Sequence, residues 1–161
     1  MQKRVTVVIP NYNGMKYLKT CLDSLARQVF QEFDTIVVDN ASADESRTFI
    51  RENYPWVRLI VMDKNTGFSG AVNRGIREAK TPYVILLNND TEADRKFVLE
   101  MVQIMDSDER IFSANCKLVQ FYNRDRLDDA GDLYTIVGWG FQRGVDHSSQ
   151  SYNRRTDVFS A

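Results

Sequence analysis

Short apolar runs alternate with longer segments of helical periodicity in this chain, and this alternation constrains the fold most. The runs are rich in β-branched residues and lie at residues 5–9, 35–38, 57–62, 83–87 and, more weakly, 111–119. Between the first two runs, apolar side chains recur at helical spacing at Leu18, Leu22, Leu25 and Val29. Strands and helices in this order form βαβ units, which make the strands parallel. Because the runs have no polar face, we expect helices on both sides of the sheet.

The sequence therefore predicts an α/β fold, a Rossmann-like, mostly parallel open sheet over residues 1–120. Residues 121–161 are polar and contain glycine, and they predict an irregular segment. A new apolar run begins at Val158, three residues before the sequence stops. We therefore expect a domain truncated at its C-terminus, with a further portion missing.

Composition excludes several classes of function. The net charge is -1, from 21 basic and 22 acidic side chains, so no basic field attracts nucleic acid. No run approaches the ~20 apolar residues that span a bilayer. A single histidine argues against a histidine-based zinc site or a Ser-His-Asp triad. Cys21 and Cys116 lie in apolar stretches and predict buried, reduced thiols, as in the cytoplasm.

Polar residues follow four of the predicted strands, where each strand ends. These residues are Pro10, Asn11, Tyr12 and Asn13, then Asp39 and Asn40, then Asn65 and Gly67, and finally Asn88, Asn89 and Asp90. Ligands of open parallel sheets bind beyond the carboxyl ends of the strands. Taken singly, such residues are as easily turn formers or helix caps, and Ser42–Glu45 resembles a capping box for the second helix. Their convergence on one edge favours a ligand site.

The residue types at this edge suit a nucleotide with a diphosphate. Asp39 can accept a hydrogen bond from an N–H group of a base, and Tyr12 can stack on that base. Asp90 can hold Mg²⁺ or Mn²⁺, because such cations are often held by one or two carboxylates together with substrate phosphates. The chain has neither a P-loop nor a G-x-G-x-x-G motif.

Four segments of the chain resemble those of family 2 glycosyltransferases, in the same order and at similar separations. The segments run from Val7 to Asn13, Val37 to Asp44, Asn65 to Gly75 and Leu86 to Thr91. Each is a weak signal alone, but the four together are specific. The resemblance covers about the first 120 residues. Within the family, the chain looks most like bacterial cell-surface rhamnosyltransferase-type enzymes.

The resemblance implies a GT-A fold and a nucleoside diphosphate sugar as donor. It places the Pro10–Asn13 turn and Asp39 around the base, and Asn65, Gly67 and Asn73 along the nucleoside, with Asn40 and Asn89 beside them. Asp90 would be the last residue of the family's metal-binding D-x-D motif, whose first position is here Asn88. The family's general base is a later carboxylate, so the catalytic residue is unknown and expected beyond Ala161.

The expected function is an inverting glycosyltransferase that moves a sugar from a UDP- or dTDP-linked donor to a hydroxyl of a saccharide or lipid-linked acceptor, in cell-surface polysaccharide synthesis. We expect it in the cytoplasm, with peripheral association at the inner face of the membrane through missing parts. One alternative is a noncatalytic nucleotide-sugar-binding or assembly module that uses the same residues. A nucleotidyltransferase ranks last, because such enzymes open with a glycine-rich basic loop that the Pro10–Asn13 turn lacks.

Overall fold

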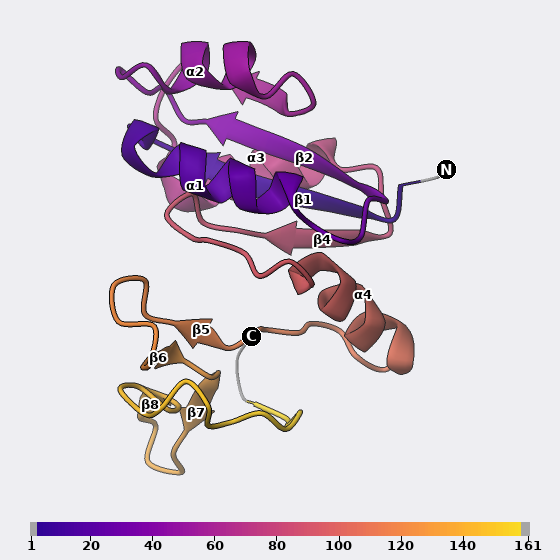
Figure 1. The fold of residues 1–161 in the computed structure, drawn as a ribbon, viewed down its shortest axis with the longest axis vertical. Coiled ribbons are helices and arrows are strands. Elements are labelled where there is room, and N and C mark those ends of the chain that lie inside the picture. The colour runs from indigo at the N-terminus through magenta and orange to yellow at the C-terminus, as the bar shows by residue number, and fades with distance from the viewer. Residues whose placement is uncertain (1–2, 159–161) are drawn as a thin grey trace. The chain divides into compact units, whose positions relative to one another are not determined.

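The computed structural model describes residues 3–158, and these fall into two compact units, Met1–Val102 and Gln103–Ala161 (Figure 1). The first unit holds a parallel sheet and its helices, and the second holds short antiparallel strands. The domain boundary expected at residue 120 stays a prediction.

The sheet of the first unit has four described strands in the order β3-β2-β1-β4, and every pairing is parallel. Their bounds are β1 Val5–Asn11, β2 Phe33–Asp39, β3 Arg58–Val61 and β4 Tyr83–Leu86. Val8 lies opposite Ile36 on one side and Leu86 on the other. The carboxyl ends of β1 and β2 are in register, since Asn11 pairs with Asp39. This register brings the turns after both strands to the same edge.

Helices cover both faces of the sheet, as expected. Their bounds are α1 Met15–Ala26, α2 Ser46–Asn53, α3 Gly67–Glu78 and α4 Phe97–Ser107. Figure 1 shows α1 and α3 on opposite sides of the strands. Val5, Val7 and Ile9 of β1 face the side covered by α1, where side chains of α2 and α4 also pack. Ile36 and Val38 of β2 face the other side, against α3. Successive strand residues point to opposite faces, which explains why both kinds of position are apolar.

Helix α1 buries the apolar stripe that its sequence predicts, up to a point. Leu18, Leu22 and Leu25 are fully buried against the sheet. The helix ends at Ala26, so Val29 lies outside it and is exposed. The expectation that Val29 continues the stripe was therefore wrong. Its backbone N–H donates to the carbonyl of Arg95 instead, an interaction between distant segments that helical periodicity does not report.

Helix α3 crosses β1 and β2 so closely that only glycine fits at its contact point. A Cβ atom on Gly75 would lie 2.2 Å from a methyl group of Val8 and 3.2 Å from one of Val38. Both valines are fully buried in the sheet and have no room to withdraw. The close approach sets the depth at which α3 lies on the sheet, and with it the position of the turn that precedes the helix.

We expect Gly75→Ala to lower the free energy of unfolding by about 1–3 kcal/mol, because overpacking a core costs about that much. Helix propensity alone would give the opposite result, a more stable protein, since alanine is a better helix former than glycine by about 1 kcal/mol. Urea denaturation of the chain measures the change. Arg77→Ala, at an exposed position of the same helix, serves as the control and should change stability little. A stabilised Gly75→Ala protein would show that the contact is not tight.

The second unit departs from the expected fifth strand at residues 111–119. Only β5, Leu118–Val119, is a strand, and it pairs antiparallel with β6, Leu127–Asp129. The segment expected to be irregular also contains a hairpin of β7, Asp132–Tyr134, and β8, Gly140–Gln142. These strands are too short to produce a readable alternation in sequence. Of the further strand expected from Val158 onward, residues 159–161 lie outside the described part of the chain.

Among residues 3–158, no helix combines the length and the apolar character that crossing a bilayer requires.

Candidate functional site

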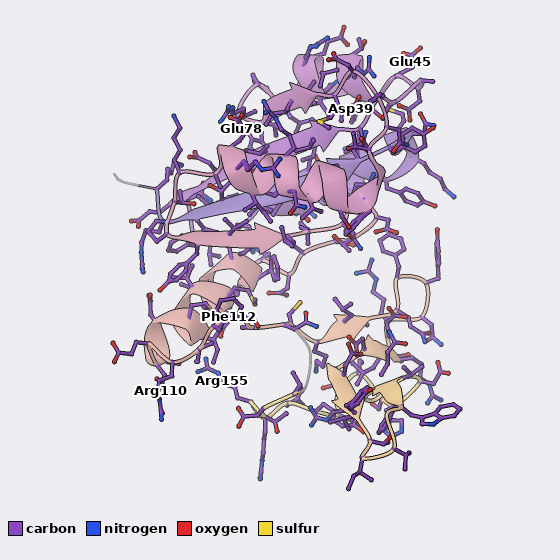
Figure 2. The ribbon with its side chains drawn as sticks, turned by 180° about the vertical axis from the view of Figure 1, so that it is seen from behind. Asp39, Glu45, Glu78, Arg110, Phe112 and Arg155 are labelled. Atoms are coloured by element: carbon purple, nitrogen blue, oxygen red, sulfur yellow. The ribbon has the colours of Figure 1, made fainter. Side chains whose placement is uncertain are left out.

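Asp39 is the centre of a buried polar network at the carboxyl edge of the sheet. Its Oδ1 accepts a hydrogen bond from Asn11 Nδ2 at 3.1 Å. Its Oδ2 accepts from the backbone N–H of Ser42 at 3.1 Å and from Arg47 Nε at 2.6 Å. The side chain has no exposed surface, and Figure 2 shows Asp39 near the end of the strands while Glu45 lies farther out at the periphery. A buried carboxylate is tolerated because it is paired and hydrogen-bonded.

The turns after β1 and β2 are tied together by polar side chains. Ser42 Oγ accepts hydrogen bonds from the Asn13 N–H and from Asn11 Nδ2, at 2.9 and 3.3 Å. Asn13 Oδ1 accepts from the Ala43 N–H at 2.8 Å. Neither residue caps a helix by a side-chain bond, and α2 begins at Ser46 rather than after a capping box. The capping-box expectation was wrong because Ser42 bonds across to the other turn.

A second group of amides fixes the turn after β3. Asn40 Nδ2 donates to Asn65 Oδ1 at 2.9 Å and to the carbonyl of Gly67 at 3.0 Å. Asn40 Oδ1 accepts from the Thr66 N–H at 2.9 Å. Gly67 has φ +76°, a conformation that favours glycine. The Asn40 N–H also donates to the Asn11 carbonyl, so this group is linked to the network around Asp39.

Asn89 joins the turn after β4 to the same network. Its Nδ2 donates to Asn11 Oδ1 at 2.8 Å. Gly14 lies beside this bond, and a Cβ there would come within 2.2 Å of both partner atoms. Asn11 therefore connects the turn of its own strand with those of β2 and β4, and Asn40 links the turn after β3 to this group. Asn11 is itself almost fully buried.

Two non-glycine residues of these turns have left-handed backbone conformations. Asn13 has φ +50° and Ala41 has φ +62°. Asparagine tolerates this region, whereas alanine has no polar side chain to compensate and pays about 1–2 kcal/mol. Such strain persists only where surrounding structure enforces it, and it concentrates at functional sites.

Three of the expected site residues stay outside the network and exposed. Tyr12 is 54% exposed, and Asn73 and Asp90 are also exposed. In the described residues, no hydrogen bond or ion pair engages the Asp90 carboxylate. Pro10, the remaining expected residue, is partly buried at the end of β1. The edge thus combines a buried network of hydrogen-bonded side chains with three exposed groups that can contact a ligand. These are the ring of Tyr12, the amide of Asn73 and the carboxylate of Asp90.

Asp90 fits a divalent cation that takes most of its ligands from elsewhere. Residues 3–158 contain no cluster of three or more His, Cys, Asp or Glu side chains that could hold a metal by itself. One carboxylate beside the exposed amide of Asn88 offers hard oxygen donors, which Mg²⁺ accepts when substrate phosphates complete its shell. The donor set therefore fits a cation that binds together with a diphosphate.

Two ionisable side chains near this edge have shifted pKa values. Burial raises the pKa of the Cys21 thiol to about 12, and the nearby Asp90 carboxylate adds to the shift. The protonated thiol donates to the Asn88 carbonyl, with the sulfur 3.7 Å from the oxygen. Burial also opposes ionisation of Asp44, but hydrogen bonds from Ser46 and the Met15 N–H outweigh it and hold the Asp44 pKa below its usual range. Cys116 is only partly buried, unlike Cys21.

Three contributors to the site escaped the sequence analysis, namely Arg47, Gly14 and the bridging role of Ser42. Arg47 follows Asp39 by eight residues, and nothing in its local pattern reports that α2 turns its side chain back onto β2. Gly14 reads as an ordinary turn glycine beside Asn13. The sequence did contain a signal for Ser42. The apolar periodicity of α2 begins only after residue 46, which places Ser42 too far before the helix to cap it.

Solved structures share this fold at TM-scores above 0.6. A mannosyltransferase from Pyrobaculum calidifontis, in complex with GDP-Man and Mn²⁺, has a TM-score of 0.63 and 25% identity, and the match covers 69% of this chain and 34% of that chain. S. aureus TarS in complex with UDP has a TM-score of 0.61 and 23% identity, over 66% and 33% of the two chains. The expected GT-A-type α/β fold is confirmed, and the chain is shorter than these neighbours.

Curated proteins are also similar to this chain in sequence. Glycosyltransferase GlyG of Streptococcus pneumoniae is 28% identical over 142 residues, covering 85% of this chain and 44% of the relative. The teichoic acid poly(glycerol phosphate) polymerase of Staphylococcus epidermidis is 32% identical over 93 residues, covering 55% and 13%. The chain thus spans less than half the length of either relative. The model of the family described as glycosyl transferase family 2 matches residues 6–150, most of the sequence, and the protein therefore belongs to that family.

Proposed function

We propose that the protein is the donor-binding part of an inverting glycosyltransferase that uses a nucleoside diphosphate sugar. The observation that carries the proposal is the joining of four strand-end turns through Asn11 and Asn40, with Tyr12 and Asp90 left exposed beside them. A pre-organised polar edge of this kind suits a ligand with several hydrogen-bonding groups and a diphosphate. A solved neighbour holds a nucleotide sugar and Mn²⁺ on the same fold.

The proposed nucleoside site has a division of labour. Tyr12 stacks on the base and Asp39 accepts from a base N–H, while the exposed Asn73 reaches the nucleoside from α3. The buried amides of Asn11 and Asn40 mainly hold these groups in position. The full proposed set is Pro10, Asn11, Tyr12, Asn13, Asp39, Asn40, Asn65, Gly67, Asn73 and Asn89, with Asp90 for the metal.

The proposed reaction is one in-line displacement at the anomeric carbon, which inverts its configuration. A divalent cation at Asp90 would supply positive charge to the departing diphosphate. Asp90 holds its carboxylate in solvent with no competing partner among the described residues, so it is available for that role. A later carboxylate is proposed to take the proton of the acceptor hydroxyl. We assign no general base within residues 3–158.

Polysaccharide synthesis at the cell surface is the proposed context. The names of relatives support it, including the teichoic acid polymerase and the amylovoran biosynthesis glycosyltransferase AmsB of Erwinia amylovora, 37% identical over 92 residues. The acceptor would then be a saccharide or lipid-linked glycan. A rhamnosyltransferase-like donor preference, a cytoplasmic location and association with the membrane face stay predictions.

Calorimetry with nucleoside diphosphates tests the proposal. We expect the chain to bind UDP or dTDP, and to bind it more tightly when Mn²⁺ is present. Absence of binding to UDP, dTDP and GDP alike would refute the proposed function. If the protein binds donor but transfers no sugar when the gene's complete product is assayed, the noncatalytic binding module becomes the better description.

A further inference from the structure

Arg47 limits what the Asp39 carboxylate can still accept. A carboxylate offers about four lone-pair positions, two on each oxygen. Oδ2 already accepts two hydrogen bonds, from the Ser42 N–H and from Arg47 Nε. Oδ1 accepts one, from Asn11 Nδ2. A single acceptor position therefore remains, and it is on Oδ1.

Arg47 is also the most exposed of the three residues that donate to this carboxylate. Its side chain is 33% exposed, whereas Asp39 is fully buried. The other two donors belong to Asn11 and Ser42, which are only 1% and 6% exposed. In the described chain, no hydrogen bond engages the terminal Nη groups of Arg47, which leaves their N–H donors available. A ligand that approaches Asp39 thus meets N–H donors beside one acceptor oxygen.

Bases differ in the edge that would meet this arrangement. Uracil and thymine present one ring N–H flanked by carbonyl oxygens, so they need one acceptor with donors beside it. Guanine presents two adjacent N–H donors, which pair best with both oxygens of a free carboxylate. Resting on the proposed function, which places Asp39 at the base, we infer that Arg47 determines base specificity: by occupying Oδ2 it admits uracil or thymine and disfavours guanine.

A matched pair of substitutions isolates this role. Arg47→Met keeps an unbranched side chain that ends near the position of Nε and lacks the donor, so it frees the second position on Oδ2. Arg47→Gln carries an N–H at the place of Nε and can keep Oδ2 occupied. Calorimetry measures the affinities of each protein for UDP and GDP, and Arg51→Gln, at an exposed site on the same helix, is the control.

The expected result is a change in the ratio of the two affinities rather than a general loss. The native protein should prefer UDP over GDP, and Arg47→Met should shift the ratio toward GDP by about tenfold, the scale of one bidentate base contact. Arg47→Gln and Arg51→Gln should retain the native ratio within about threefold. Thermal unfolding midpoints measured without nucleotide report the structural effect separately, because removing the cationic partner of a buried carboxylate lowers stability. Such a structural effect should weaken the binding of UDP and GDP alike and leave their ratio unchanged.

Several outcomes would overturn the inference. A native protein that binds GDP as well as UDP removes its premise, and this comparison needs no variant to fold. An unchanged ratio in Arg47→Met, or an equal shift in Arg47→Gln, would show that the bond to Oδ2 does not select the base. Failure of the native protein to bind either nucleotide refutes the proposed function instead, so the two failures are distinguishable.

Discussion

Replacing Asp39 with alanine is expected to lower the free energy of unfolding by about 3 kcal/mol. The substitution leaves two buried donors, Asn11 Nδ2 and the Ser42 N–H, with a lost partner, and each such orphaned group costs about 1–3 kcal/mol. Arg47 contributes less to this loss, because its partly exposed side chain can turn to water. Urea denaturation of native and variant chains, followed by far-ultraviolet circular dichroism, measures the difference.

The matched control for this substitution lies on the same strand. Asp34→Ala removes a carboxylate from the exposed beginning of β2, where no hydrogen bond holds it in the described chain, and should change stability by less than about 0.5 kcal/mol. Loss of nucleotide binding in Asp39→Ala is also expected, and it is interpretable only at temperatures where the variant remains folded. A change below about 1 kcal/mol would mean that the network contributes little to the fold.

Replacing Asp90 with asparagine is expected to remove the effect of Mn²⁺ on nucleotide binding. Removing a residue that only orients a metal ligand typically lowers metal affinity by about 10–100-fold. Removing the carboxylate that itself binds the metal should therefore lower the affinity for Mn²⁺ by about 100-fold. Stability should be unchanged, because Asp90 is exposed and unpaired among residues 3–158. Titration of UDP into native and variant chains, with and without Mn²⁺, measures both the metal effect and the remaining affinity.

An opposite change at the neighbouring position sharpens this test. Asn88→Asp adds a second carboxylate two residues before Asp90, and should strengthen the Mn²⁺ effect, since one or two carboxylates are the usual protein contribution to such sites. Asn88 binds its neighbours through its backbone carbonyl, so the substitution should leave the fold intact. If Mn²⁺ tightens UDP binding equally in native and Asp90→Asn proteins, the cation is held elsewhere.

Much of the fold followed from the amino-acid sequence alone. The pattern of β-branched runs and helical periodicity predicted the parallel sheet, its helices on both faces and the turns at which polar residues gather. These features depend on burial of apolar side chains at fixed periods, which a linear sequence displays directly. The placement of Asn11, Asp39, Asn65 and Asn89 at or just after the carboxyl ends of four successive strands likewise indicated that they would share one edge.

Only the tertiary structure decided how those residues interact. It paired Asp39 with Arg47, used Ser42 to bridge two turns rather than to cap α2, and left Tyr12 and Asp90 exposed. It also reduced the expected fifth strand to Leu118–Val119. The reason is physical: a polar side chain chooses among several partners of similar energy, and the choice depends on which distant backbone the packed core brings within about 3 Å.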